Sequence, residues 1–344
     1  MKRTISLVAA AIILVLLVAA LFVYKKFIAG PGVPKGLATY YVEIPTNSSF
    51  EEVLGILRED GFVKDEGIFR MLSERMGYKR SPMRAGRFEL KPGWNTIEMI
   101  RQLRSGEQAP VKLVLTNERL IENVAAKAAR FIEPDSLQIW SLFQNEAYLD
   151  SIGYTSETLM SLFIPNTYEF YWNTSPRSFM SRMIREHDAF WEKNGRLEKA
   201  RSLNMTPAEV YTLASIVEKE TLRSEEKPRV AGAYLNRLKI GMRLQADPTC
   251  VFATRDFDTP RVTDYHTKFD SPYNTYLYAG LPPGPISMAS ISSIDAVLNA
   301  EDHDYLYFCA VGDGSGFHAF AKTLAAHNQN AARYRENLKQ RGLR

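Results

Sequence analysis

The sequence predicts an α+β protein made of a single N-terminal transmembrane helix, a small α+β module and a larger mixed α/β domain. Three observations lead to this prediction. A long uncharged run opens the chain, a strand–turn–helix pattern repeats within residues 40–110, and helical periodicity dominates the rest until a final pair of strands. Hydrophobic residues make up 45% of the 344 positions and charged residues 24%, which argues against extensive disorder.

The first expected element is a membrane anchor. Residues 5–24 carry no charge, and roughly twenty residues at ~1.5 Å each cross a hydrocarbon core of ~30 Å. The run is longer than the apolar stretch of a secretory signal and leads directly to Lys25 and Lys26, which favours an uncleaved helix. We therefore expect residues 1–4 in the cytoplasm, one pass through the cytoplasmic (inner) membrane, a linker over residues 25–39, and an extracytoplasmic (periplasmic) body.

The positive charge of the chain belongs to this terminus. There are 43 Lys and Arg residues against 39 Asp and Glu, a formal net charge of +4, but the first 35 residues contain five bases and no acid. The body therefore carries a net charge of −1. A nucleic-acid-binding protein needs a basic surplus on its folded surface, so that class is excluded.

A small repeated unit follows the linker. Residues 42–44 alternate as a short strand, and residues 49–57 form a helix with one apolar face that Ser49 can cap. The pattern returns as a strand at 88–90 followed by a helix over 95–103, and a weaker copy begins at 111–115. Units of this size bury their apolar faces against one another, so residues 40–110 are expected to form one module.

Basic residues gather between the two copies of this unit. They make either an ordinary solvated face or a contact surface for anionic lipid heads or cell-wall polymer. The residues are Lys79, Arg80, Arg84, Arg87 and Lys91.

The most informative helix begins at Thr206. Thr206 and Glu209 form a capping box with proline in the first turn, and the helix carries Glu218, Lys219 and Glu220. At ~100° per residue the two glutamates flank opposite sides of the apolar face, and Lys219 points to solvent. We expect the Glu218 carboxyl to be partly desolvated with a raised pKa, as a general acid requires. The alternative is a surface charge or a buried ion pair.

Polar loops and a final strand pair complete the chain. The loops at 244–249, 271–276 and 280–286 are rich in Asn, Gln, Asp, Tyr, Gly and Pro, which suits sugar binding and capped structural turns equally. The sequence then predicts a hairpin with strands at 305–311 and 317–322, and a helix from about 324 to 340.

Several chemistries lack their usual residue patterns. The five histidines show no metal-ligand spacing, and Cys250 and Cys309 are too few for a disulfide framework or a four-thiolate site. No phosphate-binding loop and no nucleophile elbow occurs. We therefore expect no metal and no cofactor.

Four blocks in this order resemble the YceG-like family of endolytic murein transglycosylases. They read LASIVEKET at 213–221, LQADPT at 244–249, SPYNT at 271–275 and GLPPGPI at 280–286. The resemblance extends from about residue 40 to 340. Two departures are Ala246, where the family more usually has threonine, and a variant loop over 255–268.

The resemblance implies a LysM-like module over residues 40–110 and a YceG-like catalytic domain over 111–344. It implies cleavage of the β-1,4 bond between N-acetylmuramic acid and N-acetylglucosamine within glycan strands, leaving 1,6-anhydro ends. Glu218 matches the family's catalytic glutamate, which protonates the glycosidic oxygen and then takes a proton from the muramyl 6-hydroxyl. The expected sugar contacts are Gln245, Asp247, Tyr273 and Asn274.

The implied partners are peptidoglycan strands, the membrane and penicillin-binding peptidoglycan synthases, beside which the enzyme would end nascent strands. Two other functions stay open. One is a muramidase that hydrolyses the same bond with Asp247 as second carboxylate, and the other is a non-catalytic, membrane-anchored scaffold that binds the cell wall.

Overall fold

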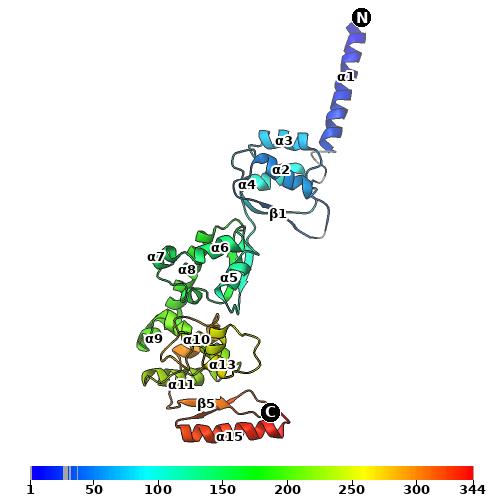
Figure 1. The fold of residues 1–344 in the computed structure, drawn as a ribbon. Coiled ribbons are helices and arrows are strands. Elements are labelled where there is room, and N and C mark those ends of the chain that lie inside the picture. The colour runs from blue at the N-terminus through cyan, green and yellow to red at the C-terminus, as the bar shows by residue number, and fades with distance from the viewer. Residues whose placement is uncertain (1, 26–29, 31, 37, 344) are drawn as a thin grey trace. The chain divides into compact units, whose positions relative to one another are not determined.

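The computed structural model describes residues 2–25, 30, 32–36 and 38–343 (Figure 1). The chain divides into two compact units, each with helices and strands. The first comprises Met1–Lys112, Phe131–Pro134 and Glu169–Ser175, and the second comprises Leu113–Arg130, Asp135–Tyr168 and Pro176–Arg344. The domain bounds expected from the sequence, with the LysM-like name for residues 40–110, stay a prediction.

Helix α1 runs from Lys2 to Val23, and its described side chains extend from Val8 to Phe22. Among the residues that the structure describes, no helix has both the length and the apolar character needed to cross a membrane. The predicted transmembrane helix over 5–24 and the single-pass localisation in the cytoplasmic membrane are therefore wrong.

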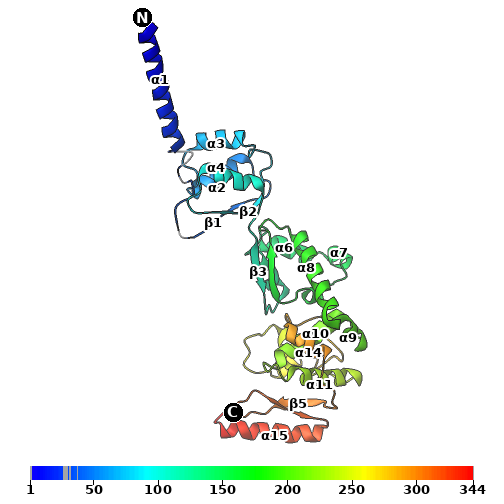
Figure 2. The ribbon, with the colours of Figure 1, turned by 180° about the vertical axis from the view of Figure 1, so that it is seen from behind.

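Between residues 40 and 105, the first unit has three helices on one side of a two-stranded sheet, as Figures 1 and 2 show. Strand β1 (Tyr40–Ile44) pairs antiparallel with β2 (Gly86–Leu90), in the register Tyr40 opposite Leu90. The helices are α2 (Phe50–Glu59), α3 (Glu66–Arg75) and α4 (Thr96–Ser105).

Alternation in the strands explains this packing. Val42 and Ile44 of β1, with Phe88 and Leu90 of β2, point to the helices and are almost completely buried. Capping boxes begin α2 at Ser49 and α4 at Asn95, so both helices start where the sequence predicts.

The described part of the predicted linker packs against this core. Val33 is fully buried, and the backbone N–H groups of Gly32 and Val33 donate to the Trp94 carbonyl at 2.8 and 2.9 Å. Residues 26–29, 31 and 37 of the predicted linker lie outside the described residues.

Four members of the basic cluster make contacts within this unit, two of them being Lys79 over the Phe50 ring and Lys91 over the Trp94 ring. The Arg87 guanidinium lies 3.5 Å from the centre of the Tyr41 ring, and Arg84 donates to the Ser105 carbonyl at 2.9 Å. Contact of this cluster with lipid heads or wall polymer stays a prediction.

Strands β3 (Val111–Leu115) and β4 (Asn166–Phe170) pair with each other, and the second unit is otherwise mainly helical. Its helices before the hairpin are α5 (Ile121–Ala128), α6 (Ser136–Phe143), α7 (Glu146–Ser151), the 3-10 turn η2 (Leu159–Leu162), α8 (Pro176–Glu192), the 3-10 turn η3 (Lys193–Gly195), α9 (Arg196–Ser202), α10 (Pro207–Glu220), α11 (Lys227–Lys239), α12 (Asp247–Thr254), α13 (Asp264–Thr267) and α14 (Ile291–Leu298).

Helix α10 is the centre of this unit. Every residue from Val210 to Val217 is buried, because α9, α11, α12 and α14 surround the helix. Its polar side chains are satisfied internally: the Tyr211 hydroxyl donates to the Phe163 carbonyl at 2.8 Å, and the Ser215 hydroxyl donates to the Thr212 carbonyl at 2.7 Å. The sequence predicts one buried apolar face, but in the structure this stretch of α10 is buried on all sides, polar residues included.

The predicted C-terminal hairpin and helix are confirmed. Strand β5 (Tyr307–Ala310) pairs antiparallel with β6 (His318–Ala321), and α15 (Leu324–Gln340) lies along β5 in both views (Figures 1 and 2).

Candidate active site

Glu218 lies near the end of α10 and forms a partly buried ion pair. Its Oε2 lies 2.9 Å from the Lys227 ammonium, and the side chains are 18% and 7% exposed, respectively. The hydroxyls of Ser290 and Ser293 donate to the same oxygen, the latter at 2.5 Å. Burial raises the pKa of the Glu218 carboxyl, but these donors together outweigh it and lower the pKa below its usual value. The raised pKa predicted for Glu218 is therefore wrong, and the buried ion pair is formed.

Glu220 has the properties that the sequence assigned to Glu218. It ends α10, and its Oε1 accepts a hydrogen bond from the Tyr234 hydroxyl at 2.6 Å. Burial, reinforced by the nearby charge of Asp247, raises the pKa of Glu220 to about 7, against the lowering effects of Tyr234 and Arg237. A carboxyl with this pKa exchanges protons near neutral pH, as an acid–base group requires.

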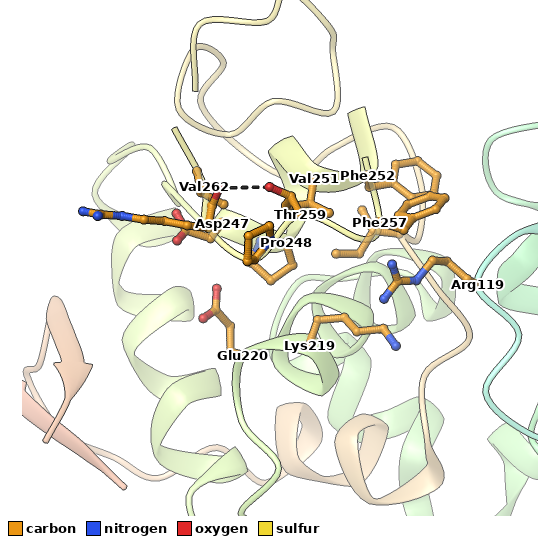
Figure 3. Close-up of a pocket in the computed structure, with 13 residues that line it drawn as sticks. Arg119, Lys219, Glu220, Asp247, Pro248, Val251, Phe252, Phe257, Thr259 and Val262 are labelled. Atoms are coloured by element: carbon orange, nitrogen blue, oxygen red, sulfur yellow. Dashed lines mark hydrogen bonds between the residues drawn. The ribbon is translucent and has the colours of Figure 1, made fainter. Parts of the chain in front are cut away.

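Glu220 also lines the larger of two neighbouring cavities in the second unit. The cavity has a volume of about 440 Å³, and Glu220 and Asp247 line it together (Figure 3). Val251, Phe252 and Phe257 supply an apolar wall. Glu218 is not among the lining residues. The cavity therefore combines an acid–base carboxyl, further polar and charged groups and an apolar wall, as a site for a polar ligand requires.

Asp247 reaches the cavity because it is the first residue of α12. The sequence predicts a loop here, but Pro248 in the first helical turn continues the chain as a helix. The Tyr276 hydroxyl donates to Asp247 Oδ1 at 2.5 Å, which fixes the direction of the carboxylate. Two tyrosines, Tyr234 and Tyr276, thus each orient one of the two acids.

The other predicted sugar contacts have different positions. Tyr273 lines a second cavity of about 220 Å³, which shares Arg119 and Phe252 with the first. Gln245 is exposed, in a left-handed backbone conformation with φ of 49°, and it does not line the larger cavity.

Asn274 is completely buried. Its amide donates to the carbonyls of His266, Thr267 and Phe269 at 2.8 to 3.2 Å. The loop at 271–276 is thus at least partly the capped structural turn that the sequence left open, and it carries Tyr273 on its surface.

Sequence reasoning missed three cations in this site, namely Arg119, Lys219 and Arg261. Lys219, predicted to point to solvent, lines the larger cavity with Arg119 because α12 and the segment 257–262 cover that side of α10. The signal available for Glu220 was a second glutamate two residues after Glu218 on the same helix. Only the tertiary packing distinguishes the two glutamates.

Comparison with known proteins shows the family to which the chain belongs. The family model described as the YceG-like family matches residues 42–333, most of the chain. The chain belongs to the YceG-like family. Within it, a Bacillus subtilis protein named endolytic murein transglycosylase is 28% identical over 93% of this chain and 91% of its own length.

Two further relatives extend the comparison. A Streptococcus pneumoniae protein with the same name is 27% identical over 85% of this chain, and the chain spans 58% of that relative's length. The crystal structure of a putative YceG-like protein from Listeria monocytogenes superposes with a TM-score of 0.57 at 28% identity, covering 85% of this chain and 98% of the other.

Proposed function

We propose that this chain is a lytic transglycosylase that cleaves murein glycan strands internally, with Glu220 as its acid–base group. Relatives named endolytic murein transglycosylase support the reaction. The single observation that supports the residue is a carboxyl with a pKa near 7 at the wall of the larger cavity. Strongly shifted pKa values at a cavity wall are typical of catalytic sites, which favours an enzyme over a non-catalytic scaffold.

One carboxyl is enough for the reaction. Protonated Glu220 gives its proton to the glycosidic oxygen as the bond from that oxygen to the muramyl C1 breaks. The muramyl 6-hydroxyl then bonds to C1 and returns a proton to Glu220, which leaves a 1,6-anhydro end and consumes no water. Tyr234 positions the Glu220 carboxyl throughout, and Asp247, which lines the same cavity, would stabilise the positive charge that develops at C1.

Asp247 keeps hydrolysis as a second candidate. Both acids line one cavity, and each affects the other electrostatically. If Asp247 activated a water molecule, the same cleavage would leave reducing ends, as in a muramidase.

Two substitutions separate these hypotheses. Glu220→Gln keeps the size and hydrogen-bonding capacity of the side chain but cannot transfer the proton, so we expect cleavage of purified glycan strands to fall by about 10²–10⁴-fold. Glu218→Gln changes the residue to which the family resemblance of the sequence assigns the catalytic role; it is the matched control and should retain more activity.

Mass spectrometry of the products decides the reaction. Anhydro ends support transglycosylation, and reducing ends would establish hydrolysis instead. If Glu220→Gln kept full activity and Glu218→Gln lost it, the acid–base role would belong to Glu218.

An association with penicillin-binding synthases is a finer proposal, which co-purification with a synthase would test.

A further inference from the structure

Arg119 and Lys219 place two positive charges at one end of the larger cavity. Figure 3 shows both side chains on the same side of it, beneath Phe257. The Arg119 guanidinium lies 4.5 Å from the centre of the Phe257 ring, a cation–π contact that fixes its position. Both residues are half-buried.

Among the described residues, neither cation forms an ion pair with an acid, although Glu220 and Asp247 line the same cavity. Nor does either side chain form a hydrogen bond in that part of the chain. Glu122 is an acid that lines the second cavity together with Arg119. Glu122 instead pairs with Arg255 at 3.2 Å. Two like charges held together in a partly desolvated cavity repel each other, and an anion would relieve that cost.

The electrostatics of Lys219 are consistent with this repulsion. Burial and then the neighbouring charge of Arg119 lower the pKa of Lys219, against the opposing effect of Glu218. A bound anion would raise that pKa again.

We propose that Arg119 and Lys219 bind a carboxylate of the peptide that murein strands carry on their muramyl residues. The proposal rests on the proposed function and names its substrate: peptide-bearing strands rather than bare glycan. Murein sugars themselves are uncharged where the peptide occupies the lactyl carboxyl, so the anion that recurs along the strand belongs to the peptide. Lys219 adjoins Glu220 in the sequence, which brings the carboxylate site close to the bond that is cleaved.

The arrangement also suits the chemistry of a carboxylate. Arginine presents a planar set of donors that can bind both oxygens, and lysine adds a compact charge. Because Arg119 lines both cavities, a peptide that leaves the sugar near Glu220 could continue toward Tyr273.

The test compares uncrosslinked peptide-bearing strands with strands from which an amidase has removed the peptides. A third substrate has its peptide carboxylates converted to amides. For the wild type, we expect kcat/KM to be at least about tenfold higher on the carboxylate-bearing strands than on the other two substrates. The difference should arise mainly from a lower KM. A tenfold preference corresponds to about 1.4 kcal/mol. In Arg119→Gln/Lys219→Met that preference should fall to about one.

The control variant Arg201→Gln/Lys239→Met leaves Arg119 and Lys219 unchanged. It removes the same amount of charge from exposed positions outside the cavity, and should keep the preference. Arg119→Lys/Lys219→Arg keeps both charges and should restore much of it. Binding of the same strands to Glu220→Gln, measured by calorimetry, should weaken with added salt only for carboxylate-bearing strands.

Equal wild-type activity on all three substrates would overturn the carboxylate site and leave the proposed function intact. An equal loss of activity on all three substrates in the double variant would also overturn the carboxylate site, because Arg119 and Lys219 would then stabilise the fold or bind the sugar instead. The absence of cleavage on every substrate would refute the proposed function itself.

Discussion

Glu218 and Glu220 lie two residues apart on α10 but face different surroundings. Glu218 meets a lysine and two serine hydroxyls, all donors to its charged form. Glu220 meets a single tyrosine hydroxyl and a neighbouring acid. The sign of each pKa shift follows from these partners, since both carboxyls pay for desolvation.

Glu218→Gln should destabilise the fold because it leaves the buried Lys227 ammonium without its counter-charge. We expect a loss of about 1–3 kcal/mol in the free energy of unfolding near pH 7, measured by urea denaturation. The pKa of Glu218 is lowered in the fold, so its contribution is present above the usual value of 4.5 and is lost as the pH falls below it. Glu225→Gln, at an exposed position, is the control; equal effects of the two changes would contradict a structural role for the ion pair.

Tyr234→Phe removes the hydrogen bond that lowers the pKa of Glu220. The pKa should rise, so the basic limb of the pH profile of kcat/KM should move to higher pH than in the wild type, where it falls near pH 7. Tyr305→Phe, a tyrosine outside the larger cavity, is the comparison. An unmoved limb in Tyr234→Phe would mean that another group controls the profile.

At the scale of elements, close backbone approaches build the walls of the site. Gly284, in the block GLPPGPI, leaves no room for a side chain: a Cβ there would collide with the Glu157 carbonyl. Glu157 and Pro285 both line the second cavity. The glycine thus allows the loop at 280–286 to pack beside residue 157.

Gly284→Ala should force the two segments apart, at a cost of about 1–3 kcal/mol in unfolding free energy. Because the second cavity would change shape, KM for glycan strands should rise more than kcat falls. Gly153→Ala offers a contrast, since its Cβ would meet nothing within 4 Å, although its φ of 79° strains any side chain. If Gly284→Ala left KM unchanged, the second cavity would have no part in substrate binding.

For the whole molecule, Glu220 links stability to pH. Its pKa of about 7 in the fold exceeds the ordinary value of 4.5, so ionisation of this carboxyl opposes folding. The resulting loss of unfolding free energy grows as the pH rises from 4.5 to 7, and it persists at higher pH. Between pH 5 and pH 8 this carboxyl should cost the wild type roughly 2 kcal/mol of unfolding free energy.

Glu220→Gln removes this titration. The melting temperature of the variant should therefore exceed that of the wild type by a margin that increases from pH 5 to pH 8, measured by scanning calorimetry. A margin independent of pH would show that Glu220 ionises normally in the fold.

Local sequence determined much of this protein. Caps fixed the starts of α2, α4 and α10, alternation fixed the buried faces of β1 and β2, and four ordered blocks indicated the YceG-like family. These features depend on neighbours within a few residues, so the chain carries them without reference to the rest of the fold.

The tertiary structure decided which side chains meet. Lys227 and Ser290 approach Glu218 from α11 and the start of α14, whereas Tyr234 and Asp247 approach Glu220 from α11 and α12. Helical spacing placed the two glutamates on opposite flanks of α10 but could not say what covers each flank. Since a carboxyl's pKa depends on burial and on partners distant in sequence, only the packed structure distinguishes the ion-paired acid from the one that can exchange a proton.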